Sequence, residues 1–131
     1  MLNALGGRPL PIYGDGLNVR DWLFVEDHAE ALLAVLERGR MGENYNIGGE
    51  TERTTIKMVD AICDALECER PAAANPALRK PGINRYRDLK ALMPDRPGHD
   101  RRYSTDITKI KQHLNWAPRY RFEDALRMTV R

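Results

Sequence analysis

The sequence has little cysteine and few large aromatic residues. Its 131 residues include two cysteines, two tryptophans and two phenylalanines. The two thiols, Cys63 and Cys68, are too few for a disulfide framework, and with no histidine nearby they make a poor metal site. We therefore expect no bound metal, and the cysteine usage fits a reducing, cytoplasmic setting.

An excess of charge of one sign and a long hydrophobic run are also absent. Lysine and arginine total 21 against 19 for aspartate and glutamate, which leaves a net charge of +2. A dedicated nucleic-acid binder carries a larger basic excess. No apolar run approaches the roughly 18 residues of a membrane span, and residues 1–11 lack the basic head and apolar stretch of a signal peptide. The sequence therefore predicts neither a nucleic-acid nor a membrane partner.

Both ends of the chain have the pattern of interrupted helices. Residues 1–7 resemble the last turn of a helix that stops at Gly6-Gly7. At the other end, a helical period from Phe122 to Val130 has no cap before Arg131. A short native domain with frayed ends would give the same pattern. Because a helix needs several turns to be useful, we expect the chain to be a fragment.

Between the ends, strand and helix patterns alternate, which is typical of an α/β fold. The expected extended segments are residues 10–13, 17–25 and 43–47, and the expected helices are residues 26–38, 54–67, 104–114 and a last one from residue 122. The first of these helices has its apolar positions at Ala29, Leu32, Leu33, Val35 and Leu36. An acidic first turn and a following glycine mark its two ends.

Residues 69–95 interrupt this alternation. Four prolines, Pro71, Pro76, Pro81 and Pro94, exclude a continuous helix, so we expect an irregular loop at about 70–93. Residues 79–102 carry eight basic and three acidic side chains. The guanidinium fork matches phosphate oxygens two at a time, so this segment suits a phosphorylated ligand. A solvated, arginine-rich loop explains the composition equally well.

Three stretches are more specific than composition. They are Leu10-Pro11-Ile12-Tyr13-Gly14 with Arg20-Asp21-Trp22-Leu23-Phe24-Val25-Glu26-Asp27-His28, then Tyr45-Asn46-Ile47-Gly48-Gly49, and Asp95-Arg96-Pro97-Gly98-His99-Asp100-Arg101-Arg102-Tyr103. With them the chain resembles the C-terminal part of the dTDP-glucose 4,6-dehydratase family, within the extended short-chain dehydrogenase/reductase superfamily. The resemblance covers nearly the whole chain apart from residues 70–93. The Arg-Asp-Trp strand alone indicates the superfamily, whereas the last stretch is more specific to the dehydratases.

The resemblance implies an α/β substrate lobe whose NAD(P)-binding, Rossmann-type N-terminal part is absent. Residues 1–131 would then form a C-terminal substrate-binding region. NAD is the cofactor of the family, but its phosphate turn is Gly-x-Gly-x-x-Gly near the N-terminus, and this chain has only Gly48-Gly49. We therefore expect the chain not to bind NAD by itself. The parent enzyme is expected to be a homodimer.

The spacing Tyr86-x-x-x-Lys90 matches the superfamily's catalytic Tyr-x-x-x-Lys pair, in which both side chains share one helix face. It lies in the proline-rich loop, far downstream of the family's own pair, and short motifs recur by accident. The family's carboxylate pair for eliminating water also belongs to the absent part. We accordingly assign no catalytic residue to this chain.

Arginine and aromatic residues make the strongest candidates for contacts with a dTDP-sugar. Arg20 can hold a diphosphate with two hydrogen bonds, as the family's phosphate-binding arginine does; otherwise it forms an ion pair. Tyr13 can stack on a flat base beside Pro11, and the resemblance places this short strand along the base; otherwise it is a half-buried tyrosine.

The Asp95-Arg96-Pro97-Gly98-His99 segment supplies a second group of candidates. Pro-Gly fixes a tight turn, so Arg96 and His99 can reach a diphosphate or ribose, or else the turn is purely structural. Asp95 would orient the turn or bind a ribose hydroxyl. Thr55 stands where the family usually has an asparagine; it either contacts the substrate's phosphate region or caps its helix.

The resemblance therefore predicts the C-terminal part of a lyase that binds the nucleotide diphosphate of dTDP-glucose. The family enzyme moves a hydride from sugar C4 to NAD⁺, eliminates water across C5 and C6, and returns the hydride to C6. Its product is dTDP-4-keto-6-deoxyglucose, used for deoxysugars. One alternative is another nucleotide-sugar enzyme of the superfamily, such as a 4-epimerase. A second is a free-standing nucleotide-binding module with no catalytic role.

Overall fold

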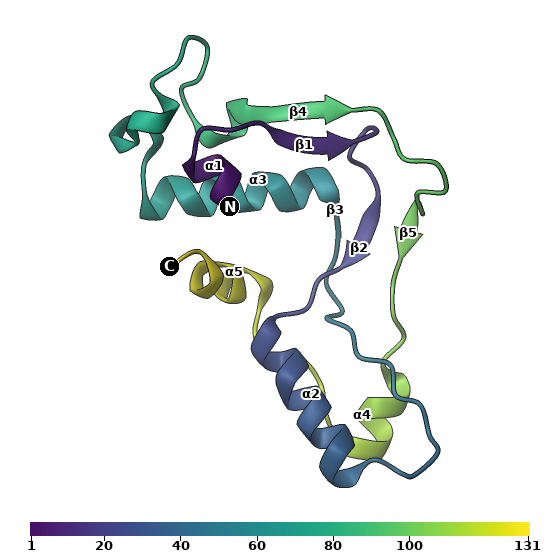
Figure 1. The fold of residues 1–131 in the computed structure, drawn as a ribbon. Helices are drawn as coiled ribbons and strands as arrows, with labels where there is room; N and C mark the ends of the chain where they lie inside the picture. Colours follow the sequence, from purple (N-terminus) through teal and green to yellow (C-terminus); the bar gives the residue numbers. More distant parts are fainter. The chain divides into compact units, whose positions relative to one another are not determined.

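A computed structural model describes all 131 residues and divides them into two compact units. Unit 1 comprises residues 1–18, 54–101 and 126–131, and unit 2 comprises residues 19–53 and 102–125. Strands and helices alternate along the chain (Figure 1), which confirms the α/β class. None of the helices has the length and apolar character that crossing a bilayer requires.

Unit 1 is built around a two-stranded parallel sheet and one long helix. Its elements are α1 (Leu2–Leu5), β1 (Leu10–Tyr13), α3 (Thr55–Glu69), the 3₁₀ helices η1 (Ala72–Ala74), η2 (Pro76–Leu78) and η3 (Tyr86–Leu89), and β4 (Lys90–Met93). β1 and β4 pair from Leu10↔Lys90 to Tyr13↔Met93. The core gathers side chains of α1, α3 and the 3₁₀ helices: Ala4, Cys63, Leu66, Ala72, Leu78, Tyr86 and Leu89. α3 begins as expected, since the Thr54 hydroxyl accepts the Lys57 N–H.

Unit 2 holds a three-stranded sheet and the remaining helices. Its elements are β2 (Val19–Asp21), α2 (Val25–Arg38), β3 (Glu52–Thr54), β5 (Arg102–Tyr103), α4 (Thr108–Leu114) and the start of α5 (Phe122–Val130). The strand order is β3-β2-β5, and β2 and β5 are parallel. The core joins α2 to α4 and the following loop through Ala31, Ala34, Ile107, Ile110, Leu114 and Trp116.

Two features of unit 2 differ from the sequence pattern. On α2 the buried apolar residues are small, Ala31 and Ala34, whereas Leu32, Leu33 and Leu36 are exposed. Residues 43–47, which the sequence predicts as a strand, form no ladder, although Tyr45 and Ile47 pack against the core of unit 2. A strand needs a neighbour for its N–H and C=O groups, and this segment has none within the chain.

Other segments also differ from their predicted bounds. The extended segment 17–25 shortens to β2, and the helix predicted from residue 104 begins at Thr108. Residues 70–93 contain no continuous helix, in agreement with their prolines, but they hold three 3₁₀ helices and β4. β4 leads directly into the Asp95–His99 segment.

Candidate functional site

The carboxyl end of β1 and the segment after β4 form a cluster of polar and aromatic side chains in unit 1. Tyr13 ends β1, and the Gly14 N–H donates to the Met93 carbonyl at 2.9 Å, which continues the pairing of the two strands. Because parallel strands end at the same edge of a sheet, the residues that follow β4 reach Tyr13. The structure thus brings together Tyr13, Asp95, Arg96 and His99, four of the residues predicted from the sequence.

Asp95 organises the turn. Its Oδ1 accepts the Arg96 N–H at 2.9 Å and lies 2.7 Å from Nδ1 of His99. The His99 N–H closes the turn on the Arg96 carbonyl at 3.2 Å, with Gly98 at a φ of 70°. The hydrogen bond from His99, with that from the Arg96 N–H, holds the pKa of Asp95 below its ordinary value. The His99 side chain is only 12% exposed, so its ring is held in one place.

Arg96 lies over Tyr13. The guanidinium carbon is 5.1 Å from the centroid of the tyrosine ring, a cation–π distance. Tyr13 is 41% exposed, so its ring and hydroxyl remain accessible to a ligand. The aromatic ring of Tyr13 and the cationic group of Arg96 therefore lie close together at one edge of the sheet. This arrangement suits a ligand in which a flat base is joined to a phosphate.

Gly14 permits the close approach of Asp95. Its φ is 61°, and a Cβ built on it would lie 2.8 Å from Oδ2 of Asp95. Further contacts tie the same two segments: Arg101 Nη1 donates to Asp15 at 2.9 Å, and Asn18 Nδ2 donates to the Asp100 carbonyl at 3.0 Å. The Gly14-Asp15-Gly16 pattern predicts the turn after the first strand, but it does not by itself predict that Gly14 and Asp15 contact the Asp95–Arg101 segment.

Most of the basic side chains in residues 79–102 are neutralised. Ion pairs or carbonyl contacts engage Lys80, Arg85, Arg87, Lys90, Arg101 and Arg102. The guanidinium of Arg96, in contrast, contacts an aromatic ring and no carboxylate. The solvated-loop interpretation thus fits most of the segment, and Arg96 is the cation best placed to receive an anion.

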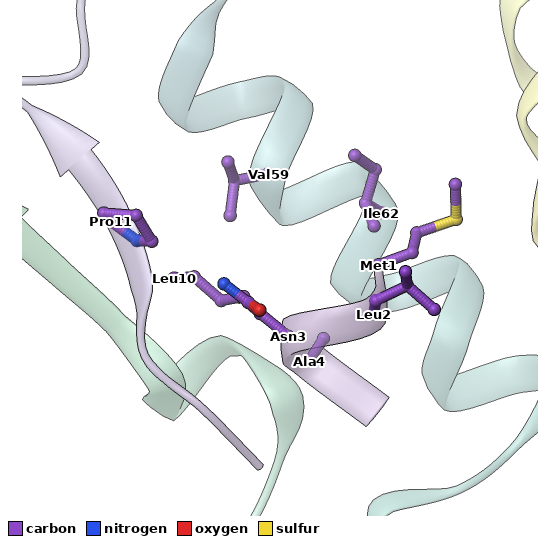
Figure 2. Close-up of a pocket in the computed structure, with 8 residues that line it drawn as sticks. All are labelled: Met1, Leu2, Asn3, Ala4, Leu10, Pro11, Val59 and Ile62. Atoms are coloured by element: carbon purple, nitrogen blue, oxygen red, sulfur yellow. The ribbon is translucent and has the colours of Figure 1, made fainter. Parts of the chain in front are cut away.

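Pro11 and Thr55 lie in unit 1 as well. Pro11 belongs to β1 and lines a pocket of about 500 Å³ between α1, β1 and α3, whose walls include Leu2, Leu10, Val59 and Ile62 (Figure 2). No charged side chain lines this pocket, so it does not suit a diphosphate. Thr55 is half-buried, and its hydroxyl donates to the Asn18 carbonyl at 3.3 Å, while the helix cap is the neighbouring Thr54.

Arg20 lies in unit 2, on β2. Its Nη1 donates to the Val19 carbonyl at 2.7 Å, and the residue is half-buried. The next residue, Asp21, accepts the N–H groups of Gly49 and Thr51, each at 2.8 Å. Asp21 therefore fixes the turn after the Tyr45–Gly49 stretch.

Neither member of the Tyr86-x-x-x-Lys90 spacing is suited to proton transfer with a ligand. Tyr86 is 0% exposed, and its hydroxyl donates to the Arg70 carbonyl at 3.0 Å. Lys90 Nζ donates to Oδ1 of Asp60 at 2.5 Å. Both side chains are therefore committed to packing within unit 1.

Gly48 and Gly49 are closely packed against their neighbours. A Cβ on Gly49 would lie 1.9 Å from the Trp22 carbonyl oxygen, and one on Gly48 would lie 2.6 Å from Oδ2 of Asp21. These two glycines are thus required by internal packing, whereas a dinucleotide turn leaves its glycine backbone open to the pyrophosphate.

Comparisons with known proteins agree with this description. The family model described as GDP-mannose 4,6 dehydratase matches residues 1–129. A dTDP-glucose 4,6-dehydratase of Neisseria gonorrhoeae is 52% identical over 130 residues, which are 99% of this chain and 36% of that protein. This chain therefore spans about a third of the length of its curated relatives.

Solved structures give the same result. The dTDP-glucose 4,6-dehydratase of Bacillus anthracis in complex with NAD is 41% identical, with a TM-score of 0.78 over 98% of this chain and 35% of that one. The enzyme of the same name from Streptomyces venezuelae, with NAD and dTDP bound, is 37% identical, with a TM-score of 0.79 over the same shares of both chains. The resemblance to the C-terminal part of these dehydratases is confirmed, and the chain belongs to the GDP-mannose 4,6 dehydratase family.

Proposed function

We propose that this chain is the nucleotide-diphosphate-binding part of a dTDP-glucose 4,6-dehydratase. The observation that carries the proposal is the position of the Arg96 guanidinium over the exposed ring of Tyr13, at the end of β1. A cation with no carboxylate partner, beside an accessible aromatic face, fits a ligand that joins a flat base to two phosphates. The 52% identity to a dTDP-glucose 4,6-dehydratase supports thymine as the base.

Each residue of the cluster has a distinct part in this proposal. Tyr13 stacks on the base, with Pro11 of the same strand bordering it. Arg96 binds the diphosphate, and Nε2 of His99 is the ring nitrogen left for a ligand, because Nδ1 faces Asp95. Asp95 holds the turn that presents both side chains.

Arg20 and Thr55 are proposed as further phosphate contacts. Arg20, on β2 of unit 2, carries a guanidinium, whose planar fork matches phosphate oxygens. The Thr55 hydroxyl donates to the Asn18 carbonyl, so it must give up this hydrogen bond in order to donate to a phosphate oxygen. The contribution of Thr55 to affinity should therefore be smaller than that of Arg96.

For the whole protein we propose the conversion of dTDP-glucose to dTDP-4-keto-6-deoxyglucose with loss of water, in a homodimer that uses NAD. The share of residues 1–131 is to bind and position the sugar nucleotide. No residue among them is assigned a proton-transfer role, since Tyr86 and Lys90 are committed elsewhere. The chain by itself should accordingly show no dehydratase activity when NAD⁺ is added.

Calorimetric titration of the chain with dTDP tests the binding proposal. Arg96→Ala should weaken the affinity about tenfold or more, the scale of a lost charge-assisted contact. Arg79→Ala is the matched control, because Arg79 is an exposed arginine of the same basic segment outside the cluster. Equal affinities for the two variants would remove Arg96 from the site, and no heat of binding for the unaltered chain would refute the proposal.

A chimera distinguishes the enzyme from its two alternatives. This chain would replace the matching C-terminal third of the Neisseria gonorrhoeae relative. A 4-keto-6-deoxy product from dTDP-glucose supports the dehydratase, whereas a C4 epimer indicates the epimerase. Binding of dTDP by the chain together with an inactive, folded chimera would favour the free-standing module.

A further inference from the structure

Three carboxylates of α3 contact the segment that leads into the candidate site. Asp60, Asp64 and Glu67 are spaced four and three residues apart, so they share one face of the helix. We call these three residues the carboxylate ladder. Glu67 contacts Tyr86, Asp64 contacts Arg87, and Asp60 contacts Lys90 and, at 3.8 Å, also Arg87. All of these residues lie in unit 1.

The contacts follow a fixed order. Glu67 Oε1 accepts the Tyr86 N–H at 2.9 Å, and its other oxygen accepts the Ala72 N–H at the same distance. Arg87 Nε donates to Asp64 Oδ1 at 2.7 Å, with a second, shorter contact from Nη2. Lys90 Nζ donates to Asp60 Oδ1 at 2.5 Å. The later a residue lies in the Tyr86–Lys90 stretch, the earlier its carboxylate partner lies on α3.

The pairing of β4 with β1 needs contacts outside the sheet to fix its register. Register is normally set by the face of a strand that is buried. β4 has no fully buried side chain, and Leu92 is 68% exposed. The sheet has only two strands of four residues each, a size that is marginal without other support.

The site depends on this register. With Lys90 opposite Leu10, Met93 falls opposite Tyr13, and the Asp95–His99 turn follows at once. A slip of one residue would reverse the faces of β4 and displace the Lys90 side chain from Asp60. It would also carry Arg96 away from the Tyr13 ring.

We propose that the carboxylate ladder is a positioning device, which sets where β4 begins on β1 and so holds Arg96 and His99 beside Tyr13. This inference rests on the proposed nucleotide-binding function of that cluster. Asp60 and Asp64 do not touch the cluster themselves; they act through Lys90 and Arg87. They are positioning residues whose loss should weaken ligand affinity while α3 stays folded.

The test uses the full 131-residue chain with Asp60→Asn and Asp64→Asn combined. Glu67 is left unchanged, because it accepts two backbone N–H groups. The matched control is Glu69→Gln, which removes a carboxylate of the same helix that pairs with Arg131. The two readouts are dTDP affinity by calorimetry and hydrogen exchange of the Gly14 amide by NMR, because that amide donates to Met93.

The double variant should bind dTDP about tenfold or more weakly and exchange the Gly14 amide at least tenfold faster, with amides of Cys63 and Leu66 unchanged. Asp60→Lys combined with Lys90→Asp should bring both readouts closer to those of the unaltered chain than either single reversal does; the recovery should be incomplete, because Arg87 also contacts Asp60. Values equal to those of Glu69→Gln would overturn the proposal. Equal acceleration across all amides of unit 1 would also overturn it, since the ladder would then only stabilise the unit.

The exchange readout keeps this inference separate from the proposed function. If the unaltered chain fails to bind dTDP, the nucleotide-binding proposal is refuted on its own. The Gly14 amide then still decides whether the ladder sets the register. Fast Gly14 exchange in the double variant supports register control, and unchanged exchange refutes it.

Discussion

Oδ1 of Asp95 receives two contacts from the turn that follows it: Nδ1 of His99 at 2.7 Å and the N–H of Arg96 at 2.9 Å. One carboxylate oxygen thus fixes both the backbone and the ring of the turn. The positions of Arg96 and His99, the two side chains proposed to contact the ligand, therefore depend on the ionised form of Asp95. This dependence makes the turn sensitive to acid.

Replacing His99 with alanine should raise the pKa of Asp95 toward its ordinary value of 3.8, because the largest cause of its lowering is the hydrogen bond from His99. A carboxyl whose pKa is lowered by folding stabilises the folded state above its unfolded pKa, and this stabilisation is lost as the pH falls through the folded pKa. Carbon NMR titration of the Asp95 carboxyl measures the shift. Asp88, whose pKa is lowered by the Asn84 N–H and Arg85, is the internal control and should not change.

The two cysteines should differ sharply in reactivity. Cys63 is fully buried, and its burial, followed by the charge of Asp60, raises the pKa of its thiol to about 11. Cys68 is exposed. A thiol reagent at pH 8 should therefore modify one cysteine in the folded chain and two after denaturation. Cys68→Ser should abolish the rapid reaction; two rapid equivalents in the unaltered chain would contradict the burial of Cys63.

Removing the Tyr86 hydroxyl should destabilise the chain by about 1–3 kcal/mol, because Nδ2 of the buried Asn75 loses one of its two hydrogen-bond partners and the Arg70 carbonyl loses a donor. The hydroxyl donates to the Arg70 carbonyl and accepts from Asn75 Nδ2 at 3.2 Å. Urea denaturation of Tyr86→Phe measures the change in the free energy of unfolding. Tyr103→Phe, at an exposed tyrosine, should stay within about 0.5 kcal/mol of the unaltered chain. A Tyr86→Phe variant with unchanged stability would show that these hydrogen bonds contribute nothing.

The exposed leucines of α2 should cause self-association of the isolated chain. Leu32, Leu33 and Leu36 form an apolar surface on one helix. Sedimentation velocity should show a concentration-dependent increase in mass, which Leu32→Glu with Leu36→Glu should reduce. Met41→Glu, at a fully exposed methionine outside the helix, is the control for added charge. A chain that is monomeric at every concentration would refute the prediction.

Local patterns predicted the parts of the fold that local interactions determine. The helices α2 and α3 follow from their periodicity and end signals, and α3 indeed has a threonine cap. β4 was not predicted, because Lys90-Ala91-Leu92-Met93 lacks both alternation and β-branched residues. Its strand conformation comes from pairing with β1, 80 residues earlier in the register Leu10↔Lys90. Such pairing leaves no local signal.

The same distinction applies to the candidate site. The Pro-Gly turn between Arg96 and His99 can be recognised from four residues, and the resemblance to a family supplied its role. The contact of Arg101 with Asp15 joins residues 86 positions apart. The sequence around Arg101 and the sequence around Asp15 do not indicate that the two residues meet. The acidic spacing of Asp60, Asp64 and Glu67 was visible in the sequence, but its partners became apparent only from the three-dimensional arrangement.

The division into two units also governs how this chain can be dissected. The polypeptide passes from one unit to the other after Asn18, Arg53, Arg101 and Ala125. Neither unit is therefore one uninterrupted stretch, and no simple truncation isolates either of them. A protease that nicks the chain near its middle would leave both products interlocked by the packing within each unit, so the nicked material should stay together until a denaturant separates it.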